Sequence, residues 1–158
     1  MSTTRTLRFT ADQIGAPHYV VAGSPSAATF GLVGDVCCVN CGARISHVFV
    51  TDVGPIGGDC LATITGDAST RAAVRTITRR LAGTPIGDLF SWTIRRNEHG
   101  ESVLGARWVE RDHRGEHRYH CAGVWRVEPA LLAAIVREHL TRWADTRGVL
   151  ARGVEVCP

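Results

Sequence analysis

Hydrophobic and polar positions alternate in three runs between residues 89 and 128. The runs are LFSWTIRR, ESVLGARWVE and EHRYHCAGVWRVE, and the polar segments NEHG and DHRG separate them. A period of two is typical of β-strands, and short polar segments that contain Gly are typical of hairpin turns. The pattern therefore predicts a three-stranded antiparallel meander.

The apolar spacing changes to that of a helix after the meander. Pro129 suits the first turn of an α-helix, where a missing N–H removes no hydrogen bond. A helix over PALLAAIVREHLTRWADTRG gathers the apolar residues into one stripe. The stripe consists of Leu132, Ile135, Val136, Leu140 and Trp143. We expect this long C-terminal helix to pack on the meander.

The N-terminal half is predicted to contain shorter elements. RTLRF and HYVVAG have the composition of strands, with the polar turn TADQIGAP between them and the linker GSPSAATFG after them. ISHVFVTD predicts another strand, and VGPIGG predicts a turn with a short return strand. CLATI predicts a short helix that ends at Gly66. Ser69 is a candidate N-cap for a helix over TRAAVRTITRRLAG, which ends at Gly83.

Composition changes how the cysteines are interpreted. Of the 158 residues, 44% are hydrophobic and 21% are charged, as in an ordinary globular domain. MSTTRTLRFTADQ lacks the apolar stretch of a signal peptide, and no apolar run is long enough to cross a bilayer. We therefore expect a cytoplasmic protein, in which six cysteines serve as metal ligands or core packing rather than disulfides.

Four of the six cysteines lie between residues 37 and 60. Cys38-Val-Asn-Cys41-Gly42 has the form of a zinc knuckle, in which two thiolates bracket a tight turn that the following Gly permits. Cys60 is expected at the N-terminus of a helix, where the helix dipole favours a thiolate. A redox pair is disfavoured because the motif precedes a strand rather than a helix, and buried packing is the other alternative. Cys37 is interpreted as packing.

The order of knuckle, hairpin and helix N-terminus resembles treble-clef-like zinc-binding modules of phage, plasmid and actinobacterial proteins. The matching residues are Cys38, Cys41, Gly42, Gly57, Cys60, Leu61 and Gly66. The resemblance covers about residues 36–67 and implies a bound Zn²⁺. Such modules often occur in proteins associated with mobile DNA. We therefore predict a single α+β domain over residues 1–158: the meander, its C-terminal helix and an N-terminal treble-clef-like zinc module.

A fourth zinc ligand is left open by the sequence. Cys121 or His120 reaches the site from the meander in the first interpretation, and Asp59, next to Cys60, is the second. His47 is the third, because a strand carries it away from the knuckle. DHRGEHRYHC also gathers His113, His117, His120 and Cys121. We interpret that group as a polar hairpin tip with surface histidines, and the alternatives are a second metal site or a catalytic His.

Arginine supplies all of the positive charge, and most of it lies in the second half. Residues 1–70 hold three Arg and five Asp, a net charge of −2, whereas residues 71–158 hold fifteen Arg and ten acids, a net charge of +5. Arg71, Arg75 and Arg79 repeat every four residues on one predicted helix, with Arg80 beside them. This stripe is either a phosphate-binding face or a solvated one.

The expected function is that of a non-catalytic, zinc-stabilised binding protein of phage or mobile-element type, with nucleic acid as its partner. One alternative is a protein-interaction factor that engages a host protein through the zinc hairpin. Another is an enzyme with an open zinc position, although no acid–base pair or phosphate loop stands out. Trp92, Trp108 and Trp125 lie on successive strands, where core packing is favoured over a stacking platform for bases.

Overall fold

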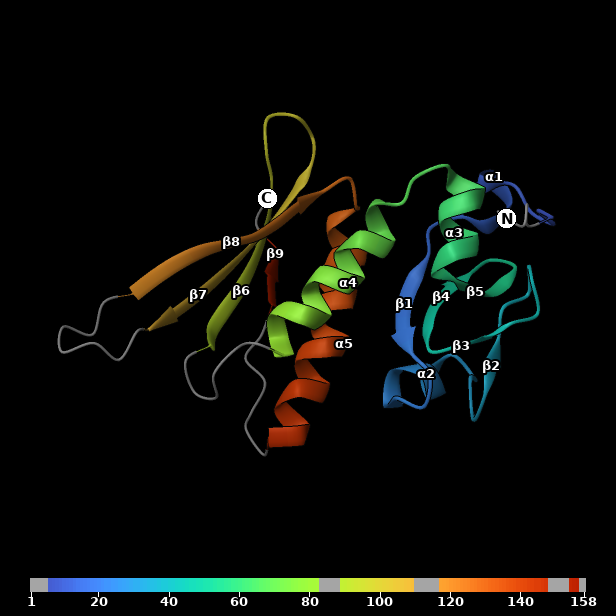
Figure 1. The fold of residues 1–158 in the computed structure, drawn as a ribbon, viewed down its shortest axis with the longest axis horizontal. Helices are drawn as coiled ribbons and strands as arrows, with labels where there is room; N and C mark the ends of the chain where they lie inside the picture. Colours follow the sequence, from blue (N-terminus) through green and yellow to red (C-terminus); the bar gives the residue numbers. More distant parts are fainter. Residues whose placement is uncertain (1–5, 83–88, 110–116, 148–153, 157–158) are drawn as a thin grey trace. The chain divides into compact units, whose positions relative to one another are not determined.

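The computed structural model describes residues 6–82, 89–109, 117–147 and 154–156, and it describes side chains for residues 6–79, 92–105, 121–139 and 156. The chain divides into two compact units, Met1–Arg71 and Ala72–Pro158. The described residues form antiparallel sheets and several helices, one of which is a long C-terminal helix. The expected mixture of α and β structure is therefore confirmed (Figure 1). One domain over residues 1–158 stays a prediction.

A three-stranded antiparallel sheet forms the centre of the first unit. Its strands are β1 (His18–Val21), β4 (His47–Thr51) and β5 (Gly54–Gly57), in the order β1-β4-β5. Tyr19 of β1 lies opposite Phe49 of β4, and both side chains are buried. The sequence predicted all three strands, because short β-branched and aromatic runs end in turns that contain Gly.

A small hairpin and a helix flank this sheet. The hairpin pairs β2 (Val36–Cys37) with β3 (Arg44–Ile45), and the cysteine turn connects them. Helix α3 (Gly58–Thr65) follows β5 directly and ends at Gly66, whose φ of 72° is left-handed. The predicted helix at Cys60 and its glycine stop are confirmed.

Two short helices in the first unit were not predicted. Helix α1 (Ala11–Ile14) lies within TADQIGAP, and helix α2 (Pro25–Thr29) lies within GSPSAATFG. Thr10 and Gln13 form a capping box at α1, and the Ser24 side chain accepts a hydrogen bond from Ala27 N at α2. The strand predicted for RTLRF is wrong, because residues 6–9 belong to no strand.

A four-stranded sheet forms the centre of the second unit. The predicted meander is present as three antiparallel strands, β6 (Leu89–Arg96), β7 (Ser102–Val109) and β8 (His117–Trp125). The expectation of three strands needs a correction, because β9 (Val154–Val156) pairs with β6 in parallel and extends the sheet. Three residues are too few to show a periodic pattern, so the sequence did not reveal β9.

Helix α5 (Pro129–Arg147) lies against β6 and β9 (Figure 1). Leu132, Ile135 and Val136 of its predicted stripe are buried, as are Trp92 and Ile94 of β6. Leu140 and Trp143 have side chains outside the described set. The predicted packing of α5 on the meander is therefore confirmed, and Trp92 is a core residue rather than part of a stacking platform.

Helix α4 (Ser69–Ala82) has one buried and one exposed face. Ala73, Val74 and Ile77 are buried. Ser69 is the first helical residue rather than the cap, and its backbone N–H donates to Asp67 Oδ1 at 2.8 Å. The predicted helix is therefore present, with a boundary shifted by one residue.

Candidate metal centre

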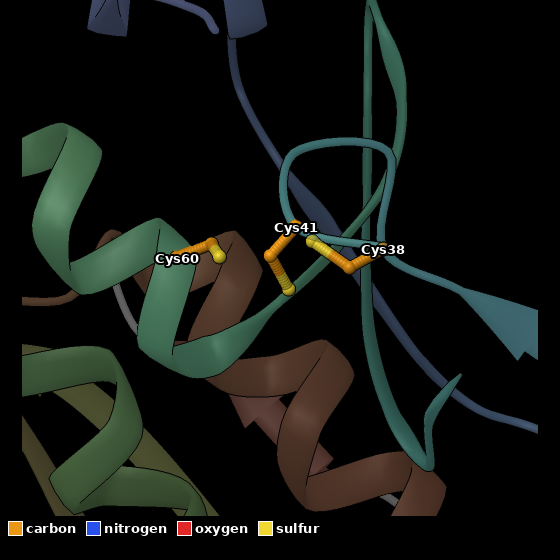
Figure 2. Close-up of side chains that lie close together, drawn as sticks. All are labelled: Cys38, Cys41 and Cys60. Carbon is orange, nitrogen blue, oxygen red and sulfur yellow. The ribbon is translucent and has the colours of Figure 1, made fainter. Parts of the chain in front are cut away.

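Cys38, Cys41 and Cys60 come together in the first unit. Their three sulfur atoms lie within 4.8 Å of one another. Cys38 and Cys41 belong to the turn between β2 and β3, and Cys60 belongs to the first turn of α3 (Figure 2). Four ligands at about 2.3 Å in a tetrahedron place sulfur atoms about 3.8 Å apart. Small movements therefore bring this cluster to the geometry of a thiolate metal site.

Backbone hydrogen bonds give the cysteine turn its shape. Gly42 N donates to Cys38 O at 2.8 Å, and Cys38 N donates to Ala43 O at 2.8 Å. Gly42 has a φ of 77°, which a side chain rarely permits, so the predicted role of this glycine is confirmed. Val39 N donates to Pro55 O at 2.9 Å and ties the turn to β5. The turn is therefore anchored next to the helix that carries Cys60.

Burial and hydrogen bonds have opposite effects on the pKa of Cys38. Burial raises the pKa of this thiol, but hydrogen bonds from the backbone of Gly57, Cys41 and Asn40 and from the Cys41 side chain lower it, and the net pKa lies below the ordinary value. Cys38 and Cys60 are buried, whereas Cys41 is exposed. Thiolates are the metal-binding form of cysteine, so the fold favours the form that a metal needs.

Asn40 is a member of the site that the sequence analysis missed. The residue is 4% exposed, and its Nδ2 donates to Cys60 Sγ at 3.3 Å. A hydrogen bond to a metal-binding sulfur orients the ligand and stabilises its charge. The one sequence signal for this role is the place of Asn40 between the two cysteines of the turn.

Two of the four candidates for a fourth ligand have other partners. Asp59 Oδ1 accepts a hydrogen bond from Arg71 Nη1 at 2.6 Å, and His47 Nδ1 lies 2.6 Å from Tyr19 Oη. Among the described residues, the close group of ligand atoms consists of the three cysteines. The fourth ligand stays a prediction.

The other two candidates, Cys121 and His120, lie on β8 of the second unit. Cys121 is exposed, and its Sγ lies 3.8 Å from Gly123 O. His120 and His117 have side chains outside the described set, and His113 lies outside the described residues. A second metal site in this group also stays a prediction.

Cys37 differs from its predicted role. It is exposed, although it neighbours the buried Cys38. Alternate residues of a strand point to opposite faces, which separates Cys37 from the cluster. The interpretation of Cys37 as packing is therefore wrong, and its thiol faces solvent.

Arginines form the exposed face of α4. Arg71, Arg75 and Arg79 are exposed, and the buried Ala73 and Ile77 lie on the other side of the helix. Arg71 forms an ion pair with Asp59 at 2.6 Å, with side chains 47% and 55% exposed. Arg80 belongs to the helix, but its side chain is outside the described set. The predicted stripe is therefore accessible, and its first member is paired.

Comparison of the chain with models of protein families, with curated proteins and with solved structures gives no match. Within the described part of the chain, no helix has the length and apolarity needed to span a bilayer. The cysteine cluster and the arginine face are therefore the features of the chain that indicate a function.

Proposed function

We propose that the chain is a non-catalytic binding protein stabilised by one Zn²⁺ that Cys38, Cys41 and Cys60 hold. The observation that supports this most directly is the convergence of the three sulfur atoms within 4.8 Å. Soft thiolate ligands select zinc over magnesium or calcium, which prefer oxygen. The lowered pKa of Cys38 adds to the case, because a thiolate binds metal without first losing a proton.

A metal at this site has a structural role in the proposal. Cys38 and Cys41 lie in the β2–β3 turn and Cys60 lies in α3, so one ion joins a hairpin to a helix. The module spans about 30 residues, and its Val36 and Val48 share a small core with Val20 and Ala27 of the same unit. Metal binding adds free energy of folding to a unit with a core of this size.

Metal analysis tests the zinc site. Protein purified without added metal is expected to contain one zinc per chain, and the variant with Cys38, Cys41 and Cys60 all changed to Ser is expected to contain none. The control is Cys37→Ser, which removes a neighbouring thiol outside the cluster. Stoichiometric zinc in the triple variant would contradict the assignment of these three cysteines as zinc ligands.

The partner in this proposal is nucleic acid, bound through the arginine face of α4. Arg71, Arg75 and Arg79 are exposed and repeat once per helical turn. Guanidinium groups bind phosphate in a planar, bidentate manner. The residues from position 71 onward also carry the net charge of +5 that results from fifteen Arg and ten acids. A row of cations of this kind attracts the phosphate backbone of a nucleic acid independently of its nucleotide sequence.

A salt titration of binding to generic DNA and RNA tests the partner. Changing Arg71, Arg75 and Arg79 to Gln is expected to lower affinity at low salt and to reduce the salt slope by up to about 3 units, one per lost contact. A triple change of Arg8, Arg44 and Arg126 to Gln is the matched control, because all three are exposed and the charge removed is the same. Equal losses of nucleic-acid affinity and of salt slope in the two triple variants would contradict binding through the arginine face of α4.

The enzyme alternative has one observation in its favour. Cys41 is exposed, so the cluster is accessible from solvent on that side. Catalytic zinc sites keep one position open, whereas structural sites have four protein ligands. X-ray absorption spectroscopy of the zinc protein distinguishes the two by the identity of the fourth ligand and by whether it exchanges, since both kinds of site have four ligands in total. Four protein ligands support the structural role, and three sulfurs with one exchangeable light ligand support the enzyme.

A further inference from the structure

The side-chain amide of Asn40 has two groups of partners. Its nitrogen contacts the cysteine cluster, and both its nitrogen and its oxygen contact the N-terminal segment, residues 6–8. Its Nδ2 lies 3.3 Å from Cys60 Sγ and 3.4 Å from Thr6 O. Its Oδ1 accepts a hydrogen bond from the backbone N–H of Arg8 at 2.8 Å. The amide is buried, so each of these contacts is costly to lose.

The contact with Arg8 determines the orientation of the amide. A backbone N–H can only donate, so the Asn40 atom that faces it is the carbonyl oxygen. The NH₂ group then faces Cys60, and its two protons serve the sulfur and the Thr6 carbonyl. A rotation of the amide by half a turn would place its oxygen against the sulfur and its NH₂ against the Arg8 N–H. The sulfur and the N-terminal segment therefore favour the same orientation.

Metal binding strengthens one of these contacts. Thiols lose their protons when they bind a metal, and a hydrogen bond to a charged acceptor is about twice as strong as one to a neutral acceptor. The stronger contact holds Asn40 in the orientation that the Arg8 N–H also requires. Residues 6–8 belong to no helix or strand, so this side chain provides hydrogen bonds that a strand partner would otherwise provide.

We propose that Asn40 couples the metal centre to residues 6–8, so that zinc binding and docking of this segment stabilise each other. The coupling is reciprocal by thermodynamic linkage. Asn40 is a positioning residue in this proposal, because it acts through the Cys60 sulfur rather than on the metal. The inference rests on the proposed zinc site.

Competition with a chromophoric chelator measures the first half of the coupling. Asn40→Asp keeps the acceptor for Arg8 N–H, but it replaces the donor to Cys60 Sγ and Thr6 O with a negative oxygen, so zinc affinity is expected to fall by about 10- to 100-fold. The control is Ala43→Asp, which adds the same charge at an exposed position two residues from Cys41. An equal loss of zinc affinity in both variants would show a general effect of the added negative charge and would overturn the proposal.

A second pair of variants tests the N-terminal side without changing the site. Arg8→Pro removes the backbone N–H that Asn40 accepts, whereas Arg8→Ala keeps it. We expect zinc affinity to fall several-fold in the proline variant relative to the alanine variant. Identical affinities would mean that docking of the segment has no effect on the metal.

Hydrogen exchange at the Arg8 amide completes the test. Chelation of the wild-type protein is expected to raise exchange at this amide, and Asn40→Ala is expected to raise it even with zinc bound. Unchanged exchange after verified zinc removal would overturn the coupling. The zinc content of every sample separates the two hypotheses: absence of zinc from the wild type contradicts the proposed function, whereas stoichiometric zinc without these effects contradicts only the role of Asn40.

Discussion

Gly57 and Gly58 are neighbours, but only one of them has room for a side chain. A Cβ at Gly57 would lie 2.9 Å from Ile45 Cγ2, whereas a Cβ at Gly58 would lie 3.6 Å from Phe49 Cε2. Gly57 also donates its backbone hydrogen bond to Cys38. We predict that Gly57→Ala lowers the free energy of unfolding by about 1–3 kcal/mol. Gly58→Ala is the control, which a helix start tolerates. Equal unfolding free energies in denaturant titrations would contradict this difference.

The lowered pKa of Cys38 predicts how the site responds to acid. Because the pKa in the folded chain lies below that in the unfolded chain, ionisation stabilises the metal-free fold at a pH above the unfolded pKa. This contribution is lost as the pH falls through the lower, folded pKa. Protons also compete with zinc for the thiolates, so we expect zinc affinity to fall on acidification. Competition with a chelator at several pH values measures the zinc affinity. A zinc affinity that does not depend on pH would contradict thiolate ligation.

At the scale of single residues, the sequence predicted the cysteines better than their surroundings. Cys38, Cys41 and Cys60 were identified because their spacing reflects a chemical requirement for closely placed sulfurs. Asn40 was missed because its partners are main-chain atoms of residues 6 and 8 and the sulfur of Cys60. Contacts between segments so far apart have no periodic signature. The exposure of Cys37 was missed for a different reason: strand alternation places it opposite Cys38, but the sequence does not show whether another element covers that face.

At the scale of elements, an ion pair connects the helix of Cys60 to the arginine face. Asp59 of α3 pairs with Arg71 of α4 on an exposed surface. Asp59→Asn is expected to release Arg71 and to raise nucleic-acid affinity at low salt by about 1.4- to 5-fold, the range for a surface ion pair. Asp12→Asn, on the exposed part of α1, removes the same charge and is the control. A gain of equal size in both variants would be a general charge effect.

Metal removal is predicted to affect some elements and not others. Residues 36–66 contain the cysteine turn, β4, β5 and α3, whose order depends on zinc in the proposal. Residues 130–145 lie in α5, which buries Leu132 and Ile135 in the second unit. We expect chelation to raise amide exchange over residues 36–66 and to leave residues 130–145 largely protected.

The pattern of exchange also tests the fourth ligand. If Cys121 or His120 binds the metal, the loss of protection is expected to extend to β8. Full protection of residues 36–66 after verified zinc removal would contradict the structural role of the metal and support either a catalytic ion or none.

The elements with long periodic patterns were predictable, and the short ones were not. The meander and α5 extend over enough residues for periods of two and of 3.6 to be distinguished. Helices α1 and α2 have four and five residues, and side-chain caps define them more than apolar spacing does. RTLRF has a strand-like composition, but the N–H of Arg8 is satisfied by Asn40 instead of a neighbouring strand.

At the scale of the whole molecule, the two units are spectroscopically distinct. All four tryptophans, at positions 92, 108, 125 and 143, belong to the second unit, and the proposed zinc site belongs to the first. Chelation is therefore expected to change the far-ultraviolet circular dichroism and to leave tryptophan emission nearly unchanged. Unfolding in guanidinium is the positive control for an emission shift. An emission shift of similar size on chelation would contradict a metal effect confined to the first unit.

The contacts of Asn40 with main-chain atoms have a consequence for how the sequence can change. Thr6 contributes its carbonyl oxygen and Arg8 contributes its N–H, so neither side chain takes part. Every amino acid supplies the carbonyl at position 6, and every one except proline supplies the N–H at position 8. Homologues can therefore diverge freely at these two positions and keep the same link, provided that an asparagine precedes the second cysteine of the turn. A search for distant relatives is better weighted toward Cys-x-Asn-Cys-Gly than toward the N-terminal residues.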